Sequence, residues 1–129
     1  MAQPPDLLYS RTHEWVRIEG GTATVGITAY AQEQLGDIVF VELPAAGKKV
    51  AQGELLGNIE SVKAVSELFA PVTGEVIAIN DVLTDHPELV NQDPFGKGWL
   101  VQVKVGVGAG EGLLDAAAYE KLLAEEGAH

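Results

Sequence analysis

An internal repeat in the middle of the chain limits the folds that this sequence can form. The stretch VELPAAGKKVAQGELL, residues 41–56, aligns without gaps with LFAPVTGEVIAINDVL, residues 68–83. The matching positions are Pro44 with Pro71, Gly47 with Gly74, Val50 with Ile77, Ala51 with Ala78, Gly53 with Asn80, Glu54 with Asp81 and Leu56 with Leu83. Glycine and asparagine tolerate positive φ best, so positions 53 and 80 are expected to form the same turn. The alternative is chance similarity between two glycine-rich strand pairs.

A repeat of two copies limits the possible architectures. A solenoid needs about three copies, so two copies do not predict one. Two hairpin units can instead pack their apolar faces together around an approximate two-fold axis. The segment between the copies, about residues 57–67, is then expected to cross from one sheet to the other.

The rest of the sequence predicts a mainly β protein with two helices. β-Branched and aromatic runs bounded by glycine and proline are typical of short strands. Strands are expected at 13–19, 22–27, 37–43, 55–61, 64–69, 75–79 and 99–105, with a hairpin turn at Gly20 and Gly21. Helices are expected near 28–35, capped by Thr28, and near 115–126, with Asp115 at its start and Gly127 at its end. These elements predict one domain, residues 1–129, folded as a flattened β-sandwich or barrel of two related halves.

Lys63 stands out in the segment between the two copies. It is the only Lys or Arg from Val50 to Gly96, and its neighbours Val62, Ala64 and Val65 are small or apolar. The same window holds the carboxylates Glu54, Glu60, Glu67, Glu75, Asp81, Asp85, Glu88 and Asp93. An amine on a projecting turn is a good target for acylation, which makes it a neutral amide. The residues alone leave two interpretations open, a presented lysine that is modified and an ordinary solvated lysine.

Charge and composition exclude several classes of function. The net charge is −11, which argues against binding to nucleic acid or to anionic lipid. The absence of cysteine excludes disulfides, thiolate catalysis and zinc–thiolate sites. The His13–Glu14 pair does not extend to a zinc-protease motif, because Arg17 stands where the second histidine is needed, and no metal site is expected. No signal peptide or membrane-spanning run is seen, so a cytoplasmic protein is expected.

The segment around Lys63 resembles the lipoyl-attachment segment of the glycine cleavage system H-protein family. The resemblance is carried by GNIESVKAVSELFAPVTGEV, and the E-S-V-K-A core within it is specific. It extends in the same order through RTHEWVRIE, TATVGITAYAQEQLGDIVFVELPAAGKKV, HPELVNQDPFGKGWLVQV and LLDAAAYEKLLAEE. The resemblance implies a flattened sandwich of two similar halves, with lipoic acid in amide linkage to Lys63 at a hairpin tip.

The resemblance also implies partners and a role without catalysis. A family member carries an aminomethyl group on its lipoyl arm from a pyridoxal-phosphate glycine decarboxylase to a tetrahydrofolate-dependent aminomethyltransferase. An FAD-containing dihydrolipoyl dehydrogenase then reoxidises the arm, and a separate lipoyl-attaching enzyme loads the lysine. The chain is therefore expected to be a monomeric carrier protein, not an enzyme.

By position, the resemblance assigns further residues to the arm. Thr12, Glu14 and Glu67 fall where the family places contacts of a cleft that holds the loaded arm. A serine often stands at the position of Thr12 and an aspartate at that of Glu67, so the longer Glu67 could change the geometry. Glu60 and Ser61 are candidates for recognition by the lipoyl-attaching enzyme. The competing interpretations are a strand-surface charge for Glu14 and ordinary turn residues for Glu60 and Ser61.

Two alternative functions stay open. One is an H-like protein that relays lipoyl groups to other enzymes without serving glycine breakdown. The other is a β-barrel binding module in which Lys63 is unmodified.

Overall fold

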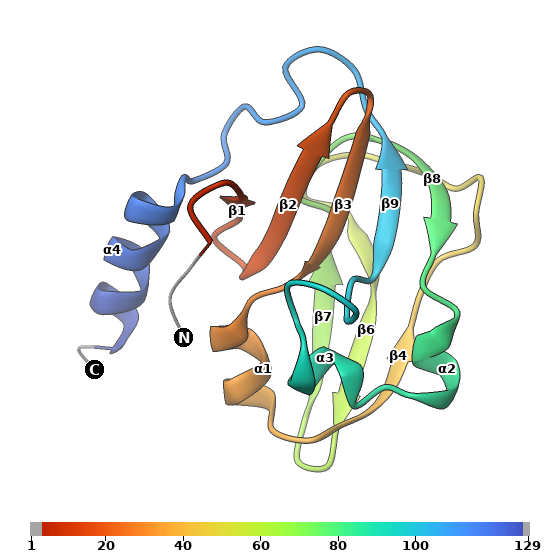
Figure 1. Cartoon of the computed structure of the whole chain (residues 1–129), viewed down its shortest axis with the longest axis vertical. Helices are drawn as coiled ribbons and strands as arrows, with labels where there is room; N and C mark the ends of the chain where they lie inside the picture. Colours follow the sequence, from red (N-terminus) through yellow and green to blue (C-terminus); the bar gives the residue numbers. More distant parts are fainter. Residues whose placement is uncertain (1–3, 128–129) are drawn as a thin grey trace.

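The β-branched runs of the sequence form two antiparallel sheets in a computed structural model, which describes residues 4–127 (Figure 1). The larger sheet has the order β1 (Leu8–Tyr9), β2 (Glu14–Glu19), β3 (Thr22–Ile27), β9 (Val101–Lys104), β8 (Gly74–Ile79), β5 (Lys49–Val50). The smaller sheet has the order β4 (Ile38–Glu42), β6 (Leu55–Ser61), β7 (Val65–Phe69). Four helices complete the described residues: α1 (Ala29–Leu35), α2 (Val82–Asp85), α3 (Leu89–Gln92) and α4 (Ala116–Gly127). The predicted mainly β sandwich is confirmed.

The predicted elements lie within about two residues of the observed ones. The helix near 28–35 is α1, and the side chain of Thr28 accepts a hydrogen bond from the Ala31 N–H (3.2 Å), as expected of an N-cap. Asp115 does the same for α4 through the Ala118 N–H (2.8 Å). No helix within residues 4–127 is long and apolar enough to span a membrane.

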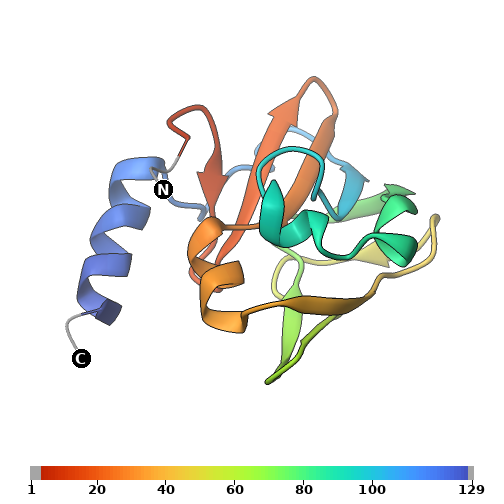
Figure 2. The same cartoon turned by 60° about the horizontal axis from the view of Figure 1, so that its bottom comes forward.

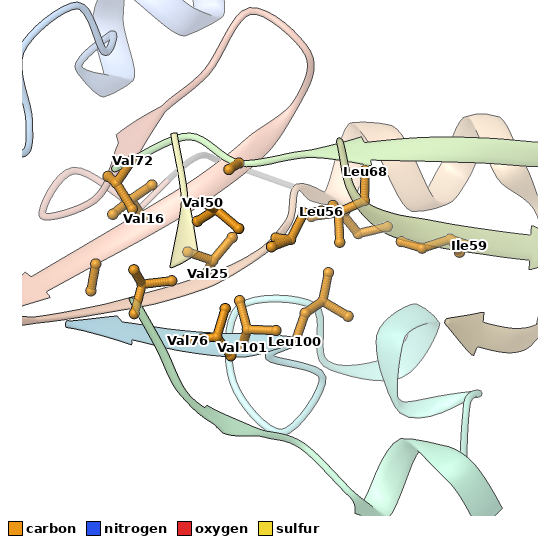
Figure 3. Packing of buried hydrophobic residues seen from close by; sticks show 14 of the residues in the cluster. Val16, Val25, Val50, Leu56, Ile59, Leu68, Val72, Val76, Leu100 and Val101 are labelled. Carbon is orange, nitrogen blue, oxygen red and sulfur yellow. The ribbon is translucent and has the colours of Figure 1, made fainter. Parts of the chain in front are cut away.

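The hydrophobic core has two parts. The main cluster fills the space between the sheets and includes Val16, Val25, Leu56, Leu68 and Val101 (Figure 3). A separate cluster joins α4 to β1 and the start of β2, and its buried members are Leu7, Tyr9, Trp15 and Tyr119. The views in Figures 1 and 2 both place α4 beside β1, away from the tip of the β6–β7 hairpin.

The two copies of the repeat pair with each other through strands β5 and β8. Val50 pairs with Gly74 in an antiparallel register, and the repeat offset maps this pair onto Ile77 and Gly47. Beside that position, the Gly47 N–H donates to the carbonyl of Val76 (2.6 Å). Each copy therefore faces the other in equivalent register, as an approximate two-fold axis requires.

Two details of the repeat prediction are wrong. Gly53 has φ of +91°, whereas His13 is the one non-glycine residue with positive φ among the described residues, so Asn80 does not share the turn of Gly53. Asn80 is buried instead, and its side chain donates to the carbonyls of Lys97 and Trp99 (2.8 Å each). The side chain of Asn80 therefore satisfies two buried carbonyls, a role that does not need positive φ.

The segment 57–67 is also not a crossover between sheets. It contributes to β6 and β7, which pair with each other in the smaller sheet. A tight turn at Ser61–Ala64 returns the chain antiparallel, which leaves no length for crossing to another layer. The chain changes sheets later, through residues 70–73, before it enters β8.

Candidate functional site

Lys63 lies at the tip of the β6–β7 hairpin, and its side chain is exposed. The hydroxyl oxygen of Ser61 accepts hydrogen bonds from the backbone N–H groups of Lys63 (3.3 Å) and Ala64 (3.1 Å). The Ser61 N–H donates to the Ala64 carbonyl (2.8 Å) and closes the turn. The Val62 N–H donates to the carbonyl of Asp37 (3.0 Å), which ties the tip to the chain entering β4. The backbone of the tip is therefore fixed while the Lys63 side chain stays accessible.

The stem of the Lys63 side chain passes over the end of α1. A Cβ atom added at Gly36 would lie 3.4 Å from Lys63 Cε. Asn91 of α3 holds this end of α1 in place. Its side-chain amide donates to the Gly36 carbonyl (2.9 Å) and to the side-chain oxygen of Gln32 (3.0 Å). Its side-chain oxygen accepts from the Ile38 N–H (2.9 Å). Asn91 was not predicted from the sequence, since its partners lie 53 to 59 positions away and no motif marks it.

The surface around Lys63 is apolar and acidic. Val62 and Val65 at the tip are 70% and 66% exposed, and Val39 and Phe40 on β4 are about half exposed. Glu60 is exposed and lies in register between Phe40 and Val65 on neighbouring strands. Exposed apolar side chains gathered at one place on a soluble protein are typical of a surface that meets another protein.

Glu14, at the start of β2, is buried, and both of its carboxylate oxygens accept hydrogen bonds. One carboxylate oxygen accepts hydrogen bonds from the hydroxyls of Ser10 (2.5 Å) and Thr12. The other accepts from the backbone N–H of Phe69 (3.3 Å) on β7. Glu14 therefore links the larger sheet to the outer edge of the smaller one. The predicted pair of Thr12 and Glu14 is brought together, and Ser10 joins them as a partner that was not predicted from the sequence.

Burial raises the pKa of the Glu14 carboxyl above its ordinary value of 4.5. Hydrogen bonds from Ser10, Thr12 and the Phe69 N–H stabilise the ionised form and offset part of this effect. A buried carboxylate with hydroxyl and amide donors is suited to bind a cationic group, because the pairing would offset the loss of hydration.

Replacing Glu14 with glutamine should change how stability depends on pH. A raised pKa in the folded state means that the contribution of Glu14 to stability is fully present below the ordinary value of 4.5. It is lost as the pH rises through the folded-state pKa. Glutamine does not titrate, so the free energy of unfolding of the wild type minus that of Glu14→Gln should fall from acidic to neutral pH.

Urea unfolding from about pH 4 to about pH 7 measures this difference. Glu19→Gln is the matched control, because it removes the same charge from an exposed position on the same strand. If this difference in the free energy of unfolding stays constant or grows toward neutral pH, the pKa of Glu14 is not raised by burial as assigned.

The structure does not bring all the predicted residues together. Glu67 is exposed on β7, opposite Asn58, and no hydrogen bond of its side chain is seen within residues 4–127. Glu14 contacts β7 two residues further along, at Phe69. The strand from Val65 to Phe69 covers about 13 Å, so a group attached to Lys63 needs a long tether to reach Glu14.

The chain is similar to known proteins over nearly its whole length. A family model described as "Glycine cleavage H-protein" matches residues 7–126. A glycine cleavage system H protein of Nitratidesulfovibrio vulgaris (strain DSM 19637 / Miyazaki F) is 57% identical over 126 residues, covering 98% of each chain. One from Rubrobacter xylanophilus is 56% identical over 123 residues, covering 95% of this chain and 96% of the relative. The crystal structure of a glycine cleavage system H protein from Mycobacterium marinum matches with a TM-score of 0.85 at 40% identity, covering 97% of this chain and 99% of that chain.

Proposed function

Because the chain belongs to the glycine cleavage H-protein family, we propose that it is the mobile lipoyl carrier of the glycine cleavage system, with lipoic acid in amide linkage to Lys63. The observation that supports this most is the exposed Lys63 at the tip of a hairpin whose backbone is held by Ser61 and Asp37. When bound, the lipoyl group would supply a disulfide that is reduced as one of its sulfurs accepts the aminomethyl group, and the dithiol left after transfer of that group would be reoxidised by the dehydrogenase. A fixed tip presents the base of the lipoyl arm to each partner in the same orientation.

The partners follow from the proposed role. They are a pyridoxal-phosphate glycine decarboxylase, a tetrahydrofolate-dependent aminomethyltransferase, an FAD-containing dihydrolipoyl dehydrogenase and the enzyme that attaches the lipoyl group. The protein serves these enzymes as a substrate and does not itself catalyse, and we propose that it does so in the cytoplasm as one domain of residues 1–129. The main core cluster supports one domain, because it joins both sheets.

We assign the loaded arm to the Glu14 site. The aminomethyl group ends in an amine that is cationic near neutral pH, and the Glu14 carboxylate is a matching acceptor with Thr12 beside it. A charge-assisted hydrogen bond in a site shielded from water is stronger than one on the surface. Glu67 lies on the strand between Lys63 and this site, where its exposed carboxylate would attract the same amine.

Glu60 and Ser61 are proposed to help the lipoyl-attaching enzyme recognise the tip. Ser61 does so through shape, because its hydroxyl oxygen accepts from two backbone N–H groups and holds the turn. Glu60 is exposed one residue before the turn and would contact the enzyme directly.

Transfer of the methylene carbon from glycine to tetrahydrofolate tests the function. The chain is prepared with and without the lipoyl group, and each form is added to the other purified components with ¹³C-labelled glycine. We expect labelled methylene-tetrahydrofolate only with the lipoylated chain. A chain that gains a lipoyl group but supports no transfer would favour a lipoyl relay, and a chain that gains none would favour an unmodified binding module.

A further inference from the structure

His13 occupies an unusual position in the loop next to Glu14. The loop joins β1 to β2, and the Ser10 carbonyl accepts from the His13 N–H (3.1 Å) while the Ser10 N–H donates to the Glu14 carbonyl (2.9 Å). His13 has φ of +71°. A three-residue hairpin loop needs one residue in the left-handed region, and glycine is the usual choice because it has no Cβ. A histidine here has a higher backbone energy than glycine would have, and contacts of its ring can offset that cost.

Both ring nitrogens of His13 are held by α4. Nδ1 lies 2.8 Å from the hydroxyl of Tyr119, and Nε2 lies 3.0 Å from a carboxylate oxygen of Glu126. The ring also packs between the rings of Tyr30 and Tyr119, with centroids 4.9 Å and 5.7 Å away. Residues more than 100 positions apart in the chain therefore meet at the loop that carries Thr12 and Glu14.

The hydrogen-bond partners of His13 determine which of its ring nitrogens carries the proton. The Glu126 carboxylate only accepts, so Nε2 carries the ring proton, and burial, which lowers the pKa of His13, favours the neutral ring. Nδ1 then accepts from the Tyr119 hydroxyl, whose oxygen accepts in turn from the hydroxyl of Thr28 (2.7 Å). The Thr28 oxygen accepts from the Ala31 N–H (3.2 Å). Every donor in this series has an acceptor, and the series ends in the first turn of α1.

We propose that α4 holds the Glu14 site in its binding geometry through His13, which acts as a positioning residue. Tyr119 and Glu126 hold the imidazole, the imidazole keeps the backbone of the loop in its left-handed conformation, and that conformation places the hydroxyls of Ser10 and Thr12 on the Glu14 carboxylate. The inference rests on the proposed role of Glu14 in holding the loaded arm, and it adds α4 to the parts of the protein that protect the aminomethyl group.

Spontaneous release of the aminomethyl group from the loaded protein, without the transferase, tests the inference. Tyr119→Phe removes one hydroxyl and keeps the ring that stacks on Tyr9 (centroids 4.7 Å apart). The matched control is Tyr30→Phe, the same change on the other side of the His13 ring, where no hydroxyl hydrogen bond is seen within residues 4–127. Tyr119→Phe should release the group about fivefold faster than wild type, the effect of one lost hydrogen bond, and Tyr30→Phe at the wild-type rate.

Glu14→Gln in the same assay separates the possible failures. If the wild type cannot be loaded, the proposed function is wrong and the inference is overturned with it. If Glu14→Gln releases no faster than wild type, the arm does not use this site. If Glu14→Gln releases the aminomethyl group faster than wild type but Tyr119→Phe releases it at the wild-type rate, the proposed function stands and the positioning role of α4 is overturned.

The tautomer of His13 gives a second readout on the unmodified protein. Long-range ¹H–¹⁵N spectra distinguish Nδ1 from Nε2, and we expect the proton on Nε2 in the wild type and in Tyr30→Phe. In Tyr119→Phe the Nδ1 resonance should move, because Nδ1 loses its donor. A wild-type proton on Nδ1, or identical ring spectra in all three proteins, would overturn the assigned contacts whatever the release rates are.

Discussion

The Lys63→Arg variant is expected to gain no lipoyl group when it is produced with lipoate and the attaching enzyme. Acylation needs a neutral amine, and the guanidinium of arginine stays protonated in proteins. Arginine keeps the positive charge and nearly the length of lysine, so the hairpin tip should keep its structure. Intact-mass analysis should show one added lipoyl group on the wild type and none on the variant, and methylene transfer from glycine should be lost.

The control for this prediction is Lys97→Arg, which changes an exposed lysine outside the β6–β7 hairpin. It should gain one lipoyl group, as the wild type does. A lipoyl group found on Lys63→Arg would show that the attachment site lies elsewhere, and its peptide would identify the true lysine.

The Gly57→Ala variant should lose a large part of the stability of the domain. A Cβ at Gly57 would lie 2.1 Å from the backbone carbonyl oxygen of Glu42 on the neighbouring strand β4. No rotamer change can relieve a clash with backbone, so β4 and β6 must move apart and disturb Leu56 and Ile59, which are buried in the main cluster. Overpacking of this kind costs about 3 kcal/mol, and the thermal midpoint should fall by roughly 10 °C.

Gly106→Ala is the matched control, because a Cβ there would meet nothing within 4 Å. Its free energy of unfolding should stay within about 0.5 kcal/mol of the wild type or rise slightly. Urea unfolding of the three proteins measures both effects. Equal midpoints for Gly57→Ala and Gly106→Ala would mean that β4 and β6 can separate at little cost.

The sequence allowed the longer elements to be predicted because their signals are local. The β6 run from Leu55 to Ser61 has the predicted bounds, and Thr28 caps α1 as its side chain suggested. The two-residue strands β1 and β5 were missed, because two residues are too few to show a period. Both exist only through their partners in the larger sheet, which a local pattern does not reveal.

Lys63 could be predicted from the sequence, whereas most contacts of Glu14 could not. Lys63 was recognised by its isolation among carboxylates, which the printed sequence displays directly. The contacts of Glu14 depend on Ser10 and on the Phe69 N–H, and the latter meets Glu14 only after two sheets have packed. The family resemblance indicated Thr12 and Glu14 by position. The contact of Ser10 with Glu14 could not be predicted, because it depends on the conformation of the loop between them, and the contacts of α4 with His13 could not, because they form only when distant segments pack together.

The exposed strand β4 has a consequence for self-association. It is an edge of the smaller sheet, its sequence Ile38–Val41 is entirely apolar, and such an edge is a template for aggregation. Asp37 and Glu42 flank this run, and a register shift between Ile38 and Phe40 interrupts its pairing pattern. A second copy paired in either direction would place like charges opposite each other at both ends, in a chain of net charge −11. Pairing of two copies through β4 is therefore unfavourable, although the strand beside Lys63 stays exposed.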